Sequence, residues 1–230
     1  MKYKIKDVIS SSITGQWGED CNDNNGTPVF GVSNLLKNGK IDFSKLAYRS
    51  IEPNKLSTSY VKNGDILIAK SGNPKVCYYQ GADDLYCACN FILTLRSNTE
   101  IIESKYLYYA IKQLFLCGDI NRCYTSTTIP NLSTKSFFDC SIDVPSKEKQ
   151  LLVVNQLTKL DMLTEYREIQ LSLFDELIKA RFVELFGDAV ENTMKWPEAL
   201  IGDNCFVTKL AGFEYTQYIN YEDFGDVVMV

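Results

Sequence analysis

Apolar residues recur at alternating steps of three and four between residues 146 and 187, which is the spacing of one face of an α-helix. Ser146 and Glu148 suit the start of such a helix, because both can interact with its unpaired amides, and Gly187 suits its end. The pattern predicts a helix of about forty residues, or roughly 60 Å. The recurring positions are Val153, Leu157, Leu160, Thr164, Arg167, Leu171, Phe174, Ile178, Phe182 and Leu185.

Eight of these ten positions are apolar, as expected for the seam of a coiled coil that pairs with another helix. The polar pair Thr164 and Arg167 lies in the middle of the seam, where polar residues set register or partner choice. An ordinary long core helix is the alternative interpretation. A helix this long exceeds what a compact domain needs, and we therefore expect it to act as a spacer.

Residues 1–145 contain short strand-like runs separated by turn signals, with one main helix expected after a capping Ser104. Asn63-Gly64 predicts a tight turn, and residues 65–69 predict a buried strand. Residues 85–96 contain a continuous apolar run and are expected to form one long strand. Trp17, beside two glycines, is expected to anchor the core. Together these elements predict a compact α+β domain with a small mixed sheet.

Residues 188–230 repeat features of the first twenty residues, which suggests a module–helix–module plan. Met-Lys-aromatic occurs at both Met1 and Met194, and Ile-x-Asp follows it at Ile5 and Ile201. The segment also contains short strand-like runs between turns, but forty residues are too few to copy the first domain. We therefore expect 188–230 to be the start of a second, truncated β-rich domain.

The composition predicts a globular chain and excludes several classes of chemistry. The chain is 45% hydrophobic and 23% charged, and its first residues lack the apolar core of a signal peptide, so we expect a cytoplasmic protein. Its eight cysteines form no CxxC pair, so we expect reduced thiols and no metal. The absence of histidine excludes Ser-His-Asp and Cys-His nucleophiles. No GxxxxGK[ST] or GxGxxG motif is present, and no cofactor is expected.

Charge is distributed unevenly along the chain. Residues 1–80 contain 11 Lys and Arg against 7 Asp and Glu, a net charge of +4. Residues 191–230 contain 2 against 7, a net charge of −5. The N-terminal domain is therefore modestly basic, and a protein with this balance would need partners to hold a polyanion.

Three stretches resemble the specificity subunit of type I restriction-modification systems. GDILIAKSG, at Gly64–Gly72, is similar to the family's segment of Gly-Asp, apolar strand, basic residue and Ser-Gly. IDVPSKEKQ, at Ile142–Gln150, resembles the entry to the family's spacer helix, with matches at Pro145 and Gln150 and departures at Ser146 and Lys149. LFDELIKARFVELFGD, at Leu173–Asp188, resembles the end of that helix.

This resemblance implies two target recognition domains separated by antiparallel helices, each domain reading one half of a split DNA sequence. Methylation and cleavage would belong to separate subunits. The chain would then contain one recognition domain at 1–145, one spacer helix at 146–187 and the opening of a second domain at 188–230. The implied partners are double-stranded DNA, methyltransferase subunits and a restriction subunit. The helix would pair with a missing C-terminal part or with a second copy of the chain.

Polar loops on the basic domain are the candidate DNA contacts, because hydroxyls and amides can read base edges while lysines reach phosphates. The two main loops are 70–75 and 124–131, and a third lies at 14–17. The candidate residues are Lys70, Ser71, Asn73, Lys75, Thr125, Ser126, Thr127, Thr128, Asn131, Thr14, Gln16 and Trp17. The expected helix-pairing residues are Val153, Leu157, Leu160, Leu171, Phe174, Ile178, Phe182 and Leu185.

Two alternatives remain open at the level of sequence. A PD-(D/E)xK nuclease needs clustered carboxylates and a lysine, and Asp84 with Glu103-Ser104-Lys105 is the only fit. The start of a helix is the simpler interpretation of Glu103 and Ser104.

No [ND]PP[YF] motif of an adenine methyltransferase is present, because Asn73-Pro74 is followed by Lys75. The other alternative is a coiled-coil interaction protein that does not bind DNA.

Overall fold

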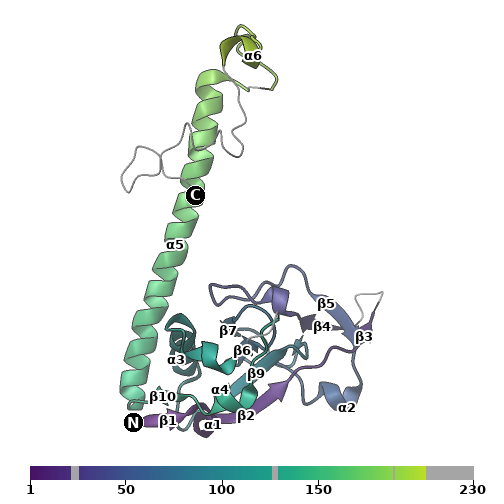
Figure 1. The fold of residues 1–230 in the computed structure, drawn as a ribbon, viewed down its shortest axis with the longest axis vertical. Helices are drawn as coiled ribbons and strands as arrows, with labels where there is room; N and C mark the ends of the chain where they lie inside the picture. The colour runs from purple at the N-terminus through teal and green to yellow at the C-terminus, as the bar shows by residue number, and fades with distance from the viewer. Residues whose placement is uncertain (22–25, 126–128, 189, 206–230) are drawn as a thin grey trace, which may run out of the picture. The chain divides into compact units, whose positions relative to one another are not determined.

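Two four-stranded sheets and one strand pair lie in the first of two units, Met1–Tyr166; the second unit is Arg167–Val230 (Figure 1). The computed structural model describes residues 1–21, 26–125, 129–188 and 190–205. The first sheet is antiparallel, in the order β2 (Ile9–Thr14), β9 (Ile92–Ser97), β6 (Ile66–Ala69) and β7 (Val76–Tyr78). The second has the order β3 (Glu19–Asp20), β5 (Ala47–Ser50), β4 (Thr27–Phe30) and β8 (Cys87–Ala88), with β4 and β8 parallel. β1 (Lys2–Lys4) pairs with β10 (Ser141–Asp143).

The helices of the described residues are mostly short. They are α1 (Ile5–Val8), α2 (Pro53–Leu56), α3 (Ser104–Leu116), α4 (Thr134–Phe138), α5 (Lys147–Phe186) and α6 (Ile201–Asn204), with 3₁₀ turns η1 (Val32–Asn34) and η2 (Asp119–Cys123). The α+β class and the long helix predicted from the sequence are confirmed. Among the described residues, no helix has the length and apolar character needed to cross a membrane.

Strand β6 lies between two hydrophobic cores, which explains its unbroken apolar sequence. Successive side chains of a strand point to opposite faces. Ile66 and Ile68 therefore pack in the core beneath α3, whereas Leu67 and Ala69 pack in the core shared with the second sheet. All four residues are fully buried, as the sequence analysis predicts for this strand.

The Asn63-Gly64 turn leads into β6 and is held by a partly buried ion pair between Asp65 and Arg96. Gly64 has a φ of +89°, the left-handed conformation that favours glycine. The next residue, Asp65, is 1% exposed and accepts two hydrogen bonds from the Arg96 guanidinium on β9, at 2.9 and 2.8 Å. These hydrogen bonds raise the pKa of Arg96. The Gly-Asp pair thus fixes where β6 begins.

Two local predictions are wrong. Residues 85–96 do not form one strand, because the chain turns at Asn90-Phe91 and passes from the second sheet into the first. Ser104 is the first residue of α3 and not its cap. Its hydroxyl instead shares a 2.6 Å hydrogen bond with the Ser97 hydroxyl on β9, which competes with capping.

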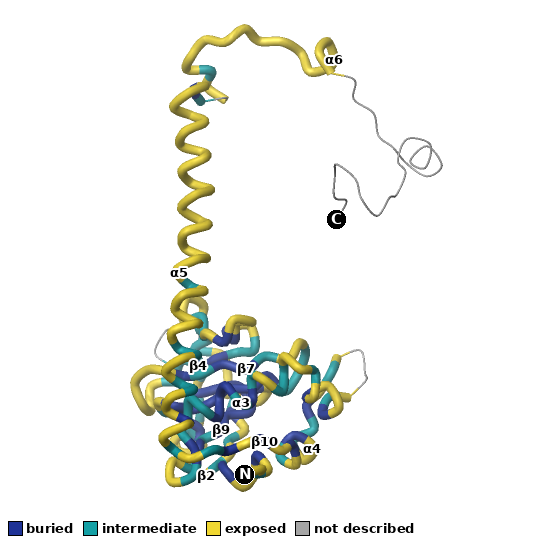
Figure 2. The backbone as a smooth tube through the Cα atoms, turned by 90° about the vertical axis from the view of Figure 1, so that its left-hand side faces the viewer, coloured by how far each residue is buried: buried dark blue, intermediate teal, exposed yellow. Residues whose placement is uncertain are grey.

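Helix α5 begins and ends within one residue of the predicted bounds. Gly187 follows it with a φ of +79°, and its N–H donates to the carbonyl of Val183 at 2.8 Å. At the start, the Gln150 side chain is 1% exposed and hydrogen bonds to three backbone groups. Val154 and Leu157 are half-buried and pack against the core beneath α3, and Val153, also half-buried, borders the groove beside that helix. From Leu160 onward the apolar seam residues are exposed (Figure 2).

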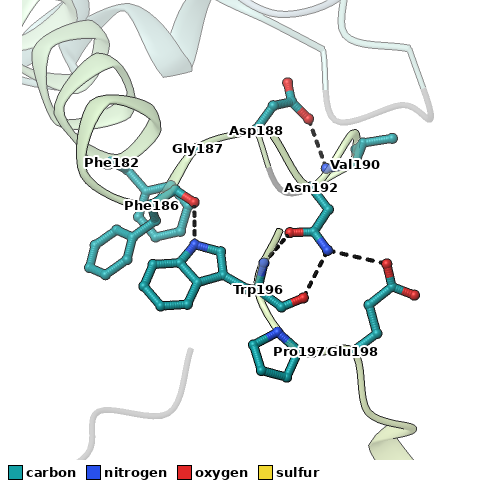
Figure 3. Close-up of a pocket in the computed structure, with 9 residues that line it drawn as sticks. All are labelled: Phe182, Phe186, Gly187, Asp188, Val190, Asn192, Trp196, Pro197 and Glu198. Carbon is teal, nitrogen blue, oxygen red and sulfur yellow. Dashed lines mark hydrogen bonds between the residues drawn. The ribbon is translucent and has the colours of Figure 1, made fainter. Parts of the chain in front are cut away.

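The end of α5 is closed by the residues that follow it (Figure 3). The Trp196 indole N–H donates to the carbonyl of Phe186 at 2.8 Å, which satisfies one of the last carbonyls of the helix. The Asn192 side chain bonds both the N–H and the carbonyl of Trp196. Phe182, Phe186 and Trp196 line a pocket here. The strands expected beyond residue 205 lie outside the described residues.

Candidate nucleic-acid interface

The two main loops predicted to contact DNA lie side by side, although 48 residues, 76–123, separate them in sequence. Ser71 and Asn131 form an antiparallel bridge. The Leu132 N–H donates to the carbonyl of Lys70 at 2.7 Å, and the Gly72 N–H donates to the carbonyl of Pro130 at 3.0 Å. The hairpin between β6 and β7 therefore extends beyond the sheet and pairs with the second loop.

The second loop is tied to the end of β6 by Tyr124. Its hydroxyl donates to the carbonyl of Ala69 at 2.8 Å, and burial raises the pKa of this tyrosine above its ordinary value. The loop closes on itself where the Thr125 N–H donates to the carbonyl of Asn131 at 3.0 Å. Both ends of the loop are thus held on the sheet. Ser126, Thr127 and Thr128 lie outside the described residues.

The third predicted loop, 14–17, is held beside β8. The Gln16 N–H donates to the carbonyl of Ala88 at 2.9 Å. A Cβ on Gly15 would overlap the backbone of Ala88 and Cys89, so only glycine allows this close approach. Thr14 is the last residue of β2 and is exposed. This loop therefore approaches the 88–91 segment, which in turn contacts Lys70.

Trp17 is not the core anchor that the sequence analysis expects. It is 39% exposed, and the Arg49 guanidinium lies 4.1 Å from the centre of its ring. Arg49 also pairs with Asp20, so the three side chains form one cluster at the edge of the second sheet. The short loop after Gly15 brings the indole to the surface, and the cation–π contact holds it there.

The two lysines of the first loop have different surroundings. The Lys75 ammonium donates to the carbonyl of Val32 at 3.1 Å and joins the hairpin to η1. The Lys70 ammonium lies 3.5 Å from the carbonyl of Asn90, a longer and weaker contact at an exposed position. Of the two, Lys70 is the freer to turn toward an external anion.

The Asn90-Phe91 turn borders the candidate interface and is not among the loops predicted from the sequence. The Lys70 N–H donates to the carbonyl of Phe91 at 2.8 Å, and the Phe91 side chain is 53% exposed. Residues Cys87 and Cys89 before the turn and Ile92 after it are fully or almost fully buried. The available signal was Asn90, a turn-forming residue within an otherwise apolar run.

The residues of the nuclease alternative take structural roles. The Glu103 carboxylate pairs with Lys147 at 3.2 Å, and the Glu103 N–H donates to the Gln150 side chain at 2.8 Å. Asp84 lies in a turn with a φ of +57°. Within the described ranges, no group of three or more His, Cys, Asp or Glu could hold a metal ion.

The predicted helix-pairing residues differ along α5. Val153 and Leu157 line a groove with residues of α3, and Tyr109 on α3 donates to Asp161 at 2.7 Å. The remaining six seam residues are each more than half exposed, at Leu160, Leu171, Phe174, Ile178, Phe182 and Leu185. Such a row of exposed large side chains is typical of a surface that another element covers.

Comparison with known proteins identifies the family. The model of the family described as "Type I restriction modification DNA specificity domain" matches residues 1–172, and the chain belongs to this family. A curated relative is the putative type I restriction enzyme MjaX specificity subunit of Methanocaldococcus jannaschii. It is 22% identical over 207 residues, which cover 87% of this chain and 48% of the relative.

Two solved structures have the same fold. The S subunit of the type I restriction-modification system of M. genitalium aligns with a TM-score of 0.52 and 17% identity, over 81% of this chain and 45% of the subunit. The HsdS subunit of Thermoanaerobacter tengcongensis aligns with a TM-score of 0.57 and 18% identity, over 81% of this chain and 49% of that subunit. The chain therefore spans about half the length of these relatives.

Proposed function

We propose that this chain recognises a DNA sequence for a type I restriction-modification complex, without catalysing a reaction itself. It would direct separate methyltransferase and restriction subunits to one half of a split target site. The observation that carries the proposal is the pairing of the 70–75 hairpin with the 124–131 loop, which gathers polar side chains on the more basic part of the chain. Family membership supports it.

The two kinds of side chain in the paired loops have separate roles in the proposal. Lys70 binds a phosphate and positions the domain on the duplex. Asn73, exposed at the tip of the hairpin, contacts a base edge, because an amide can bond adenine at two atoms in the major groove. Ser71, Thr125, Asn131, Thr14 and Gln16 supply further polar groups, together with the three hydroxyl residues 126–128.

We also propose the division of the chain into a recognition domain at 1–145, a spacer helix at 146–187 and the opening of a second domain at 188–230. The exposed seam of α5 supports a helical partner for the spacer. That partner is either the second half of a longer subunit or a second copy of this chain. In the second case, the two copies would recognise a symmetric split site.

Salt-dependent binding of the methyltransferase complex to DNA tests this function. The Lys70→Ala variant should bind every sequence more weakly and reduce the slope of log K against log salt by about one. The Asn73→Ala variant should keep that slope and lose preference at one base pair. If both substitutions weakened binding to every DNA sequence equally, the assignment of phosphate binding to Lys70 and base contact to Asn73 would be contradicted. Helix pairing without any DNA binding would favour the interaction-protein alternative.

A further inference from the structure

Phe91 and its neighbour Asn90 are exposed at the tip of a turn whose flanking residues are buried. Cys87, Ala88 and Cys89 before it are at most 1% exposed, and Ile92 and Leu93 after it are at most 2% exposed. Phe91 itself is 53% exposed. Leaving about half of a phenylalanine side chain in water forgoes about half of the stabilisation, roughly 1.5–3 kcal/mol, that full burial would give. The core therefore does not explain a phenylalanine at this position.

The backbone under Phe91 is held firmly. Asn90 and Phe91 are the central residues of a turn closed by the Ile92 N–H, which donates to the carbonyl of Cys89 at 3.0 Å. The Phe91 carbonyl accepts a hydrogen bond from the N–H of Lys70, just after β6 of the first sheet, at 2.8 Å. The Cys89 N–H donates to the carbonyl of Phe30, on β4 of the second sheet, at 2.8 Å. Hydrogen bonds therefore fasten this turn to both sheets. A ring presented on such a backbone loses little conformational entropy when it meets a ligand.

The turn lies where the three polar loops converge. The backbone N–H of Lys70 donates to the carbonyl of Phe91, and the carbonyl of Lys70 accepts from the N–H of Leu132. Phe91 therefore lies beside both main loops. The Ala88 carbonyl accepts the Gln16 N–H of the third loop at 2.9 Å. An exposed aromatic ring in this position would meet the same ligand as Lys70.

We propose that Phe91 is a specificity residue that contacts the 5-methyl group of a thymine in the recognised half-site. The inference rests on the proposed function and adds the chemical group that this position reads. Thymine presents the one apolar group among the base edges of the major groove, and phenylalanine is a suitable partner for it. Lys70 holds the neighbouring phosphate and thereby sets the distance of the ring from the base.

Removing the ring and removing the methyl group separately tests this contact. The complex of the chain with its methyltransferase subunits is measured on a duplex that it prefers and on duplexes with single thymine-to-deoxyuridine replacements. The unmodified chain should lose roughly fourfold in affinity at one replacement, the equivalent of one buried methyl group. Phe91→Ala should lose a similar factor on the thymine duplex and lose nothing further on the deoxyuridine duplex. Phe91→Leu, which keeps an apolar contact, should restore part of the sensitivity.

Leu85→Ala is the matched control, because Leu85 is 48% exposed in a different turn and should leave affinity and methyl sensitivity unchanged. Two results would overturn the inference. One is an unmodified chain that is indifferent to every deoxyuridine replacement. The other is a Phe91→Ala variant that keeps the full methyl sensitivity. A complex that shows no sequence preference would instead overturn the proposed function itself.

Discussion

The side chain of Gln150, on the first turn of α5, accepts a hydrogen bond from the backbone N–H of Glu103, just before α3, at 2.8 Å. The same amide donates to the carbonyls of Ile101 and Pro145 at 3.1 and 2.9 Å. One buried glutamine thus joins the starts of the two main helices of the first unit. This geometry gives a physical reason for a glutamine at the helix entry.

Gln150→Ala should destabilise the first unit by about 2–3 kcal/mol, because it leaves three partly buried backbone groups without their partner. The measurement is urea unfolding followed by circular dichroism. Lys149→Ala, one residue earlier and exposed, should change the free energy of unfolding by less than about 0.5 kcal/mol. Equal effects of the two substitutions would contradict the role of Gln150.

Tyr124→Phe should loosen the second loop by removing the hydroxyl that donates to Ala69. We expect a loss of about 1 kcal/mol in stability and a clear loss of DNA affinity. Tyr106→Phe is the matched control, because its hydroxyl donates to the carbonyl of Asp143 at 3.0 Å, outside the paired loops. Its hydrogen bond is exposed, so Tyr106→Phe should cost less stability than Tyr124→Phe and leave DNA affinity unchanged. If both variants bind DNA equally well, Tyr124 does not organise the interface.

Phe174→Glu and Ile178→Glu should abolish pairing of α5 with its helical partner and change the stability of the first unit little. Both side chains are more than half exposed, at 60% and 66%, so a carboxylate costs nothing until the partner covers it. Solution mass with and without the methyltransferase subunit measures the effect. Ser172→Glu, which places the same charge on the other side of the helix, should retain the assembled mass. Loss of assembly in all three variants would argue against a defined seam.

Stability should fall on the alkaline side because of buried thiols. Burial raises the pKa of Cys77 from the ordinary value of 9.0 to about 12, and that of Cys87 to about 11. The folded state thus keeps protons that the unfolded state releases, so this stabilisation is complete below about pH 9 and is lost as the pH rises toward the folded pKa. Each thiol contributes a slope of up to about 1.4 kcal/mol per pH unit.

Urea unfolding between pH 8 and 11, in the presence of a reductant, measures that decline. Cys77→Ala should make it shallower, whatever its effect on stability at neutral pH. The Cys117→Ala variant serves as the control, because Cys117 is exposed and its replacement should leave the slope unchanged. An unchanged slope in Cys77→Ala would contradict the assignment.

Sequence patterns predicted the elements whose signals are local or repeated. The bounds of α5 follow from a long periodic seam and a terminal glycine, and β6 follows from a turn at Asn63-Gly64 before an apolar run. The convergence of the two main loops was not predicted. It depends on pairing between residues about sixty positions apart, Ser71 and Asn131, and no local pattern encodes that register.

The errors have a shared physical origin in tertiary contacts. Residues 85–96 look like one strand because both β8 and β9 are buried, yet the chain changes sheets at Asn90. Trp17 looks like a core residue, but Arg49 supplies a surface partner for its ring. Ser104 is a residue type that often caps helices, but its hydroxyl forms a hydrogen bond with the Ser97 hydroxyl instead. In each case the deciding contact lies outside the short segment from which the prediction was made.

Selection from a randomised duplex library tests the central claim, DNA sequence recognition, most directly. The chain, assembled with its methyltransferase subunits, is allowed to bind the library, and the retained duplexes are sequenced. We predict a fixed short block of bases that persists when the salt concentration is raised, because base contacts add to the salt-dependent phosphate term. Retained duplexes with no common sequence, together with binding that disappears entirely with salt, would contradict the claim.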